Sequence, residues 1–412
     1  MPVCQRCIYD ERIPGITFDN QGVCNYCRQT EQLNREYPTG DVGWRKLQSL
    51  AEEIRRSSHR RRYDVVVGVS GGCDSSYLLY LTKEKLGLRP LAVHFDNTWD
   101  SRIAVENIYR VTRALDVDLF THVVDNEEFC DLFRSFFLAS VPEIDTPSDI
   151  GLAATHYLAA REFGIKYIFE GHSFRTEGIS PPGWFYMDAR YIAGIHARFG
   201  RLPMKTFPNL WLSRWLKWTI IDRIKKIRPL YYADYDKAQT KEFLQKNFGW
   251  QWYGGHHMEN RTAYFTNNYY LPRKFGIDLR FCELSAHLRA GTISRAEALD
   301  EIRRPKPFDP GILEEIKKRL AFSDDEFERV MRLPKKTFLD YTTYKPLFER
   351  LQPMFRLMAD VDLVPRSFYL KYTRHYTRDD LRCVTDAPPL PSAMADSANT
   401  QPSSRHRETA QV

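Results

Sequence analysis

The 412-residue sequence has no run of roughly 18 apolar residues, the length that a membrane span requires. Its first ten residues, MPVCQRCIYD, are polar and contain two cysteines, so they do not read as a secretory signal. A long lysine and arginine run with interleaved aromatic residues is also missing, which speaks against nucleic acid as a partner. These absences favour a cytoplasmic protein that has no membrane span and binds no nucleic acid.

Two common nucleotide-binding signatures are missing as well. No glycine-rich loop ends in Gly-Lys-Ser/Thr, and no GxGxxG opens a helix, so Walker A and dinucleotide sites are disfavoured. The eight cysteines do not indicate a disulfide framework, because such frameworks are expected in small secreted domains and this sequence is long and has no secretory signal. A net charge of +7, spread over mixed charges, favours anionic ligands such as nucleotides.

Strand and helix patterns alternate through the first half of the chain. Short β-branched runs predict strands, and amphipathic stretches between them predict helices, which together indicate an α/β fold with a mostly parallel sheet. The predicted strands are residues 63–69, 91–95, 118–123 and 166–169, and the predicted helices are 75–86, 103–115, 127–139 and 150–163.

Composition divides the chain into five parts. A cysteine-rich knob precedes a charged helical linker, and a mainly helical, aromatic-rich region for substrate or partner follows the α/β domain. Within that region Ser294 and Glu297 predict a helix with a capping box. The last part is rich in Pro, Ser and Thr, which predicts disorder. The boundaries are 1–30, 31–62, 63–235, 236–385 and 386–412.

The strongest chemical signal is VVVGVSGGCDSS at residues 65–76, where a strand ends and a helix begins. Small residues let the backbone turn tightly, so that its N–H groups and the helix dipole can hold an anion. The hydroxyls of Ser70, Ser75 and Ser76 can add to those bonds. The alternative is a structural turn with incidental glycines. It is disfavoured because a concave set of N–H groups is costly when no anion binds to it.

The knob carries C-x2-C-x16-C-x2-C, formed by Cys4, Cys7, Cys24 and Cys27. Two such pairs predict a closed tetrahedral site for a structural zinc ion. The competing interpretation is a redox dithiol, which would need only one pair in a thioredoxin-like setting. A segment this short has too little core to fold well without the metal.

Ligands of parallel sheets lie at the carboxyl ends of the strands. His94, Asp96 and Asn97 end the second predicted strand and could face adenosine, although a packed histidine explains His94 equally well. Gly171 and His172 follow the fourth strand and could approach the nucleotide or the activated substrate.

The stretch SGGCDSS resembles the SGGxDS signature of the PP-loop ATP pyrophosphatases, which include GMP synthetase, asparagine synthetase and the tRNA thiolation and lysidine enzymes. The resemblance implies an adenine nucleotide alpha hydrolase-like fold and cleavage of ATP between its α and β phosphates, with Mg²⁺ near Asp74. It assigns the pyrophosphate to Ser70, Gly71, Gly72, Asp74 and Ser75, and leaves Cys73 at a variable position. Ser70, Asp74 and His172 become the catalytic candidates.

Further stretches resemble the N-acetyl sugar amidotransferases of bacterial surface-polysaccharide and flagellin-sugar biosynthesis over roughly residues 1–345. They are CQRCIYD, GVCNYC, SVPEIDTPSD, EGHSFRTEGISPPGW, WYGGHHMENRT, LPRKFGIDLR and SRAEAL. The sequence departs from that family at His256, where a lysine is expected, and after Asp278, where LRFCELSAHL replaces a more basic run. These departures concern the choice of substrate more than the class of reaction.

The resemblance implies that the acetamido group of an N-acetyl sugar nucleotide becomes acetamidino through an O-adenylyl imidate and ammonia. A glutaminase subunit and a cyclase-like subunit would supply the ammonia, because no glutaminase nucleophile elbow is present here. Arg273 and Lys274 could meet sugar-nucleotide phosphates or form a solvated pair, and Trp250, Trp252 and Tyr253 fit the core better than a sugar platform. The other candidates for sugar binding or an ammonia path are Arg175, Glu177, Trp184, His256, His257, Glu259 and Asp278.

Two other functions fit parts of the pattern. A tRNA-modifying PP-loop enzyme of the thiolation type can also carry a zinc ribbon, but it would need a catalytic cysteine or an RNA-binding module, and Cys130 and Cys282 lack such a context. A nucleotide-binding scaffold for sugar-pathway enzymes would bind ATP without releasing AMP.

Overall fold

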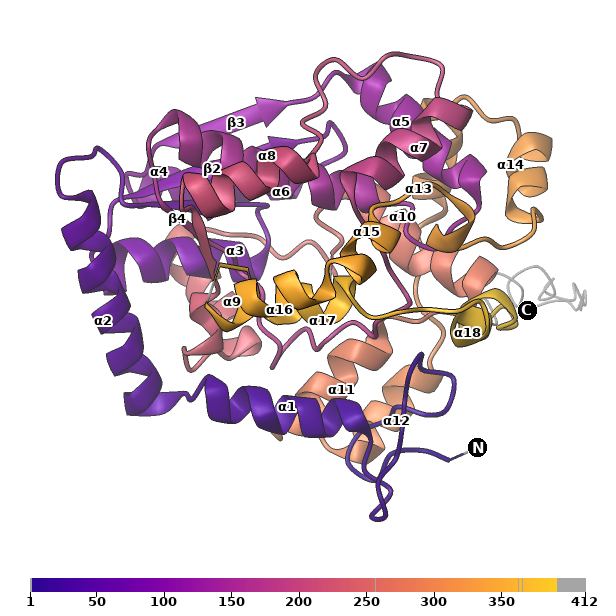
Figure 1. Cartoon of the computed structure of the whole chain (residues 1–412), viewed down its shortest axis with the longest axis horizontal. Coiled ribbons are helices and arrows are strands. Elements are labelled where there is room, and N and C mark those ends of the chain that lie inside the picture. Colours follow the sequence, from indigo (N-terminus) through magenta and orange to yellow (C-terminus); the bar gives the residue numbers. More distant parts are fainter. Residues whose placement is uncertain (1, 256, 362, 365, 391–412) are drawn as a thin grey trace, which may run out of the picture.

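The computed structural model describes residues 2–390 apart from 256, 362 and 365. Its centre is a five-stranded parallel sheet in the order β3-β2-β1-β4-β5, seen at the upper left of Figure 1. The chain builds outward from β1 to β3 and then crosses back to β4, so β1 and β4 flank the point where the strand order reverses. Ligands of open parallel sheets lie at such a point. The strands are β1 (Val65–Gly68), β2 (Pro90–Asp96), β3 (Leu119–Val123), β4 (Tyr167–Phe169) and β5 (Lys225–Ile227).

Alternating side chains of β1 anchor helices on both faces of the sheet. Val65 and Val67 pack into a cluster with Leu47 and Ile54 of α2, whereas Val66 packs with Tyr157 of α6 on the other face. Burial on both faces is what a continuous valine run in a parallel strand predicts. The helices of this half are α2 (Gly40–Ser58), α3 (Cys73–Tyr80), α4 (Arg102–Ala114), α6 (Thr146–Glu162), α8 (Leu212–Leu216) and α9 (Lys237–Phe248). Short π-helical segments at Leu81–Lys85 and Lys217–Ile221 and a 3-10 turn at Pro229–Tyr231 complete it.

The C-terminal region is mainly helical and shares an aromatic core with the α/β half. Phe133 and Phe137 of α5 (Asn126–Ala139) lie in one buried cluster with Phe265 and Phe327. In Figure 1 these helices extend to the right of the sheet. The remaining helices are α7 (Ala189–Phe199), α10 (Arg261–Phe265), α11 (Arg280–Ala290), α12 (Arg295–Arg303), α13 (Pro310–Arg319), α14 (Asp324–Met331), α15 (Lys345–Arg350), α16 (Gln352–Asp360), α17 (Arg366–Tyr372) and α18 (Arg382–Thr385), with a π-helical stretch at Thr266–Phe275 and 3-10 turns at Phe338–Asp340 and Asp379–Leu381.

The cysteine knob runs into α1 (Asn25–Glu36), which carries Cys27, and it lies beside α11 and α12 at the bottom of Figure 1. Two isolated bridges, Val3 with Asp10 and Phe18 with Cys24, shape it. The α/β class, the parallel sheet, the N-terminal cysteine cluster and the helical C-terminal region are thereby confirmed.

Three elements differ from the sequence expectation. The predicted helix at 150–163 begins at Thr146, because Pro147 stands in its first turn, where proline is tolerated. Strand β5 was not expected, since two of its three residues are lysines. Helix α7 (Ala189–Phe199) is not among the predicted elements. Within the described residues no helix is long and apolar enough to cross a membrane.

Candidate functional site

The glycine-serine loop connects β1 to α3 and is held tightly from outside. Gly71 has φ +75°, and a Cβ there would lie 2.1 Å from the carbonyl oxygen of Ala104, so only glycine fits. The Gly71 carbonyl accepts hydrogen bonds from Trp250 Nε1 at 2.9 Å and Asn107 Nδ2 at 3.2 Å. Gly72 is the N-cap of α3. The loop therefore presents the N-terminus of a helix in a fixed position, as an anion site requires.

Inside the loop the serines form long hydrogen bonds with the backbone. Ser70 N donates to Ser75 Oγ at 3.2 Å, and Gly72 N donates to Ser70 Oγ at 3.3 Å. Ser76 is buried, so its hydroxyl is less open than those of the half-buried Ser70 and Ser75. Gly171, just after β4, lies close to the loop, because a Cβ there would be 3.2 Å from Ser75 N. The fold thus brings the end of β4 against the start of α3.

Asp74 is clamped by two residues from the segment that leads into α9. The Tyr235 hydroxyl donates to Asp74 Oδ1 at 2.6 Å, and Lys237 Nζ lies 3.1 Å from Asp74 Oδ2. Burial opposes ionisation, but Lys237 and Tyr235 overcome it and hold the pKa of Asp74 below its usual value. A charged carboxylate and a charged ammonium therefore stand at the loop. Sequence reasoning missed Tyr235 and Lys237.

Two imidazole–carboxylate pairs lie close enough to influence Asp74 or its partner Lys237 electrostatically. His172 Nε2 is 3.5 Å from Glu177 Oε2, and His257 Nδ1 is 3.5 Å from Glu259 Oε1. Burial, aided by Arg228, lowers the pKa of His172 to about 3, whereas Glu259 outweighs burial and raises the pKa of His257 to about 9. One imidazole is thus neutral and the other positive at neutral pH.

The carboxyl of Glu177 differs from that of Asp74. Burial, followed by the charge of Asp74, raises the pKa of Glu177 to about 8. The side chain keeps 15% of its surface exposed, and that of His172 keeps 37%. Perturbed groups that solvent still reaches are typical of a functional site.

Residues at the end of β2 and just after it form a third group at the same edge of the sheet. His94 Nδ1 lies 3.0 Å from the Val69 carbonyl oxygen, and His94 Nε2 lies 3.2 Å from Asp100 Oδ2. Asp100 outweighs burial and raises the pKa of His94. Asp96 accepts a hydrogen bond from Thr98 N at 2.7 Å, and its carboxylate, His94 and Asp100 together could hold a cation. His94 is therefore tied to the loop as well as packed.

The four knob cysteines meet at one point and are all buried. Sγ of Cys4 lies 3.8 Å from that of Cys27, and Sγ of Cys7 lies 3.7 Å from that of Cys24. Four thiolates at about 2.3 Å from a tetrahedral zinc ion have edges of about 3.8 Å, so the cluster has the size to bind zinc. An iron–sulfur cluster places its own iron and sulfide atoms between the thiolates and needs a wider set.

Several other sequence candidates have structural partners instead. The Lys274 ammonium is buried against the carbonyl oxygens of Val330, at 2.7 Å, and Met331, at 3.1 Å. The idea that it meets a phosphate is therefore wrong. Arg273 stacks on Tyr269, and Trp184 lies in the core. Asp278 pairs with Arg280, Arg175 donates to the carbonyl oxygens of Tyr37 and Tyr231, and His256 lies outside the described residues.

Comparison with known proteins supplies a partial match to a family. Residues 259–355 match the family described as LPS biosynthesis protein WbpG-like, C-terminal domain. An uncharacterized protein of Methanocaldococcus jannaschii is 28% identical over 172 residues, which cover 41% of this chain and 58% of that protein. The chain thus spans little more than half the length of this relative.

Three solved structures are similar at low sequence identity. NMN synthetase of Francisella tularensis is 14% identical, with a TM-score of 0.27 over 55% of this chain and 92% of that one. NH3-dependent NAD synthetase of Campylobacter jejuni, in complex with nitrate, is 13% identical, with a TM-score of 0.31 over 68% and 93%. A tRNA thiolase of Methanococcus maripaludis, with its four-iron four-sulfur cluster, is 12% identical, with a TM-score of 0.28 over 81% and 89%. Scores this low do not bear on function.

Proposed function

We propose that this chain is an ATP-dependent amidotransferase that converts the acetamido group of an N-acetyl sugar nucleotide to an acetamidino group. The amide oxygen attacks the α-phosphorus of ATP and pyrophosphate leaves, which gives an O-adenylyl imidate. Ammonia then adds to the imidate carbon, and AMP departs with the former amide oxygen. One oxygen is replaced by one NH, and ATP supplies the leaving group.

The observation that carries this proposal is the rigid loop at β1 with a charged pair beside it. The long bonds from Ser70 N and Gly72 N are the ones that pyrophosphate oxygens would replace. Lys237 can then share its charge between Asp74 and the departing phosphates. Donors that are already in place stabilise developing charge without reorganisation, and this is usually the largest contribution to catalysis.

The start of the matched C-terminal region supports a role of that region in the reaction. Glu259 is the first residue of the matched region. It lies beside the glycine-serine loop, because a Cβ on Gly72 would be 3.6 Å from Glu259 Oε1. Glu259 Oε2 is buried and has no hydrogen-bond partner among the described residues. An orphaned carboxylate oxygen beside an anion-binding loop suits a cation or a substrate N–H or O–H group. We assign the sugar to this side of the loop.

The acidic groups also fit Mg²⁺, which prefers oxygen ligands and usually binds together with substrate phosphates. Asp74 and Glu259 would hold it, and it would neutralise the charge of ATP. The knob cysteines would hold a structural zinc ion. We further propose that ammonia arrives from a glutaminase subunit through a cyclase-like subunit.

The reaction is tested by incubating the full chain with ATP, Mg²⁺, ammonium and a panel of UDP-N-acetyl sugars. Mass spectrometry should find a sugar product about one mass unit lighter, together with one AMP per product, from the stoichiometry of the displacement. ADP and inorganic phosphate in place of AMP would contradict the proposal. AMP without a lighter sugar would retain the ATP pyrophosphatase and remove the sugar assignment.

A thiolating tRNA enzyme would need a reactive thiol, and the cysteines outside the knob do not supply one. Burial raises the pKa of Cys73 and Cys383 to about 11 and of Cys282 to about 12, and it also raises the pKa of Cys130. Binding of bulk tRNA that is tight and weakens steeply with salt would nevertheless favour that function.

A further inference from the structure

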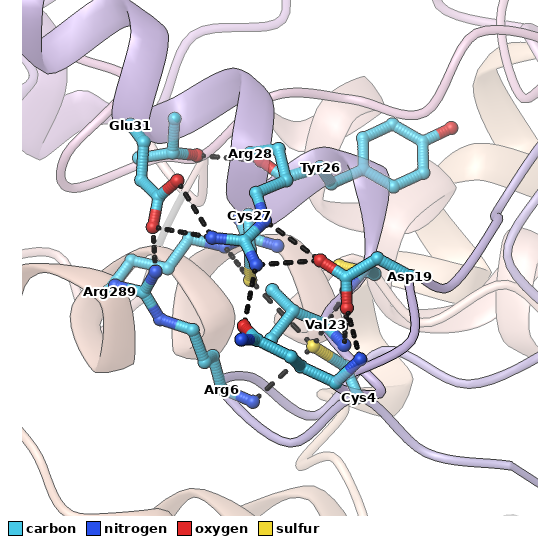
Figure 2. A network of polar contacts seen from close by, with 12 residues as sticks. Cys4, Arg6, Asp19, Val23, Tyr26, Cys27, Arg28, Glu31 and Arg289 are labelled. Atoms are coloured by element: carbon cyan, nitrogen blue, oxygen red, sulfur yellow. Dashed lines mark hydrogen bonds and ion pairs between the residues drawn. The ribbon is translucent and has the colours of Figure 1, made fainter.

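An arginine from the C-terminal region reaches into the cysteine cluster. Arg289 of α11 donates from Nε to Cys27 Sγ at 3.3 Å and from Nη2 to Cys7 Sγ at 3.4 Å. Figure 2 shows Arg289 beside the cluster, with Arg6, Arg28 and Glu31 forming an outer ring of ion pairs. Two arginines, Arg289 and Arg295, contact the knob cysteines through their side chains. Within the described residues only Arg289 donates to sulfur. It lies 262 residues from Cys27 and 282 from Cys7.

The charge of the centre explains why a cation is needed there. Four thiolates and one divalent ion leave two negative charges, and the cysteines are at most 2% exposed, so water cannot screen them. Buried charge is tolerated only when it is paired and hydrogen-bonded. N–H groups that point at thiolate sulfurs lower the charge on the ligands and hold them in place. Backbone N–H groups of Arg6 and Cys24 also donate to Cys4 Sγ, at 3.4 and 3.2 Å.

A second arginine fixes the backbone of the knob from the same direction. Arg295 Nη1, at the start of α12, donates to the carbonyl oxygens of Cys4 and Cys7, at 2.7 Å each. The Arg289 guanidinium also lies 4.8 Å from the centre of the Tyr9 ring. The knob therefore packs against α11 and α12 and is not a separate module.

Helix α11 continues from the metal centre to the nucleotide site. Gly178 has φ +79°, and a Cβ there would lie 2.6 Å from the Cys282 carbonyl oxygen, so the loop after β4 rests directly on α11. The neighbouring residue is Glu177, which pairs with His172. A shift of α11 would therefore move the wall that carries both side chains.

We propose that the cysteine cluster is a clamp between the N-terminal knob and the helical C-terminal region, with Arg289 as its positioning residue. The metal gathers the thiolates, Arg289 attaches them to α11, and α11 supports the loop 172–178 at the candidate active site. This role concerns the metal centre and does not depend on which reaction the enzyme catalyses.

The first test measures metal release from the zinc-loaded full chain under excess EDTA, followed with a chromogenic zinc indicator. Arg289→Met should release zinc about 10-fold faster or more, as is typical when a partner of a metal ligand is lost. Arg289→Lys, which keeps the charge but not the fork, should fall in between. Arg303→Met, at an exposed position at the end of α12, should behave like the parent. Release of zinc from Arg289→Met at the parental rate, or a parent that binds no metal, would overturn the proposal.

A spectroscopic readout separates a bond to sulfur from general stabilisation. With Co²⁺ in place of zinc, N–H donation to a thiolate raises the energy of the sulfur-to-metal charge-transfer band. Arg289→Met should shift this band to lower energy, and Arg289→Lys should restore part of the shift. An unchanged band in a folded, cobalt-loaded Arg289→Met chain would argue that Arg289 does not act on the ligands.

Hydrogen exchange on the parent chain needs no variant and covers the case in which Arg289→Met does not fold. After chelation, peptides of α11 and of residues 172–178 should exchange several-fold faster, while β1 and β2 keep their protection. If the change stays within residues 1–30, the knob is an independent metal module and the clamp is refuted.

Discussion

Asp74 keeps its charge in a position where burial alone would remove it, because Lys237 and Tyr235 contact its two oxygens. Asp74→Asn keeps the shape but removes the negative charge beside the Lys237 ammonium and the proposed ligand for Mg²⁺. We expect AMP formation to fall about 100-fold or more, the loss typical of a group that stabilises transition-state charge. Asp116→Asn, at an exposed position with a positive φ that asparagine tolerates, is the matched control. An Asp74→Asn enzyme as fast as the parent would remove Asp74 from the catalytic group.

Glu177 makes stability depend on pH in a direction that can be measured. Its pKa of about 8 lies above the ordinary value of 4.5, so the folded chain holds a proton that the unfolded chain releases. Stability contributed at this position is therefore present at low pH and is lost as the pH rises from about 4.5 to about 8. Glu177→Gln removes that loss.

Urea unfolding at about pH 5 and about pH 8 provides the measurement. The difference in free energy of unfolding between Glu177→Gln and the parent should grow from about pH 5 to about pH 8 by on the order of 1 to 2 kcal/mol. This is less than the full pKa shift would give, because solvent reaches part of the Glu177 side chain. Glu162→Gln, at an exposed position near the end of α6, should show no such growth. An equal advantage at both pH values would mean that Glu177 is charged in the folded chain.

At the scale of elements, the start of α9 decides where Lys237 points. Asp236 is the N-cap of this helix and accepts a hydrogen bond from Gln239 N at 2.8 Å, and Lys237 is the first helical residue. Asp236→Ala should cost about 1 kcal/mol of stability and should also raise the KM for ATP, because the turn that holds Lys237 loosens.

Another N-cap gives the matched control. Ser323 caps α14 with a capping box, far from the glycine-serine loop in sequence, so Ser323→Ala should cost a similar amount of stability without changing the KM for ATP. Thermal unfolding and ATP kinetics on both variants separate the two effects. If both variants raise KM equally, general destabilisation explains the result and the position of Lys237 does not.

Most elements of the α/β half could be predicted because local pattern and tertiary burial agree there. Three consecutive valines between turn residues fit only a buried strand, and Gly71 fits only a tight turn. The contacts of Asp74 could not be predicted in this way, since Tyr235 lies 161 residues further along the chain. No local sequence pattern identifies a tyrosine and a lysine as partners of a distant carboxylate. The spacing of the two cysteine pairs, in contrast, directly predicts that they form one site.

At the scale of the whole molecule, the C-terminal region fixes the segment after β2. Ser101 N donates to the Glu259 carbonyl oxygen at 2.7 Å, and Arg261 N donates to that of Trp99 at 2.9 Å. Arg319 of α13 lies 3.5 Å from the centre of the buried Trp99 ring and donates to the Thr98 carbonyl oxygen at 2.9 Å. The loop that carries Asp100 is thus made by both halves together.

Because both halves share this loop and one aromatic core, they should unfold together. Pulse proteolysis across a urea gradient should give one midpoint for fragments of the sheet half and of residues 259–355. Arg319→Met removes the cation from Trp99 and the donor from the Thr98 carbonyl oxygen. The free energy of unfolding should therefore fall by roughly 2 to 4 kcal/mol, and the midpoint should fall in both halves at once. Arg329→Met, at an exposed position of α14, should leave it in place. Two separate midpoints in the parent, or a loss confined to the C-terminal fragments of Arg319→Met, would mean that the sheet half folds by itself, without the region that α13 belongs to.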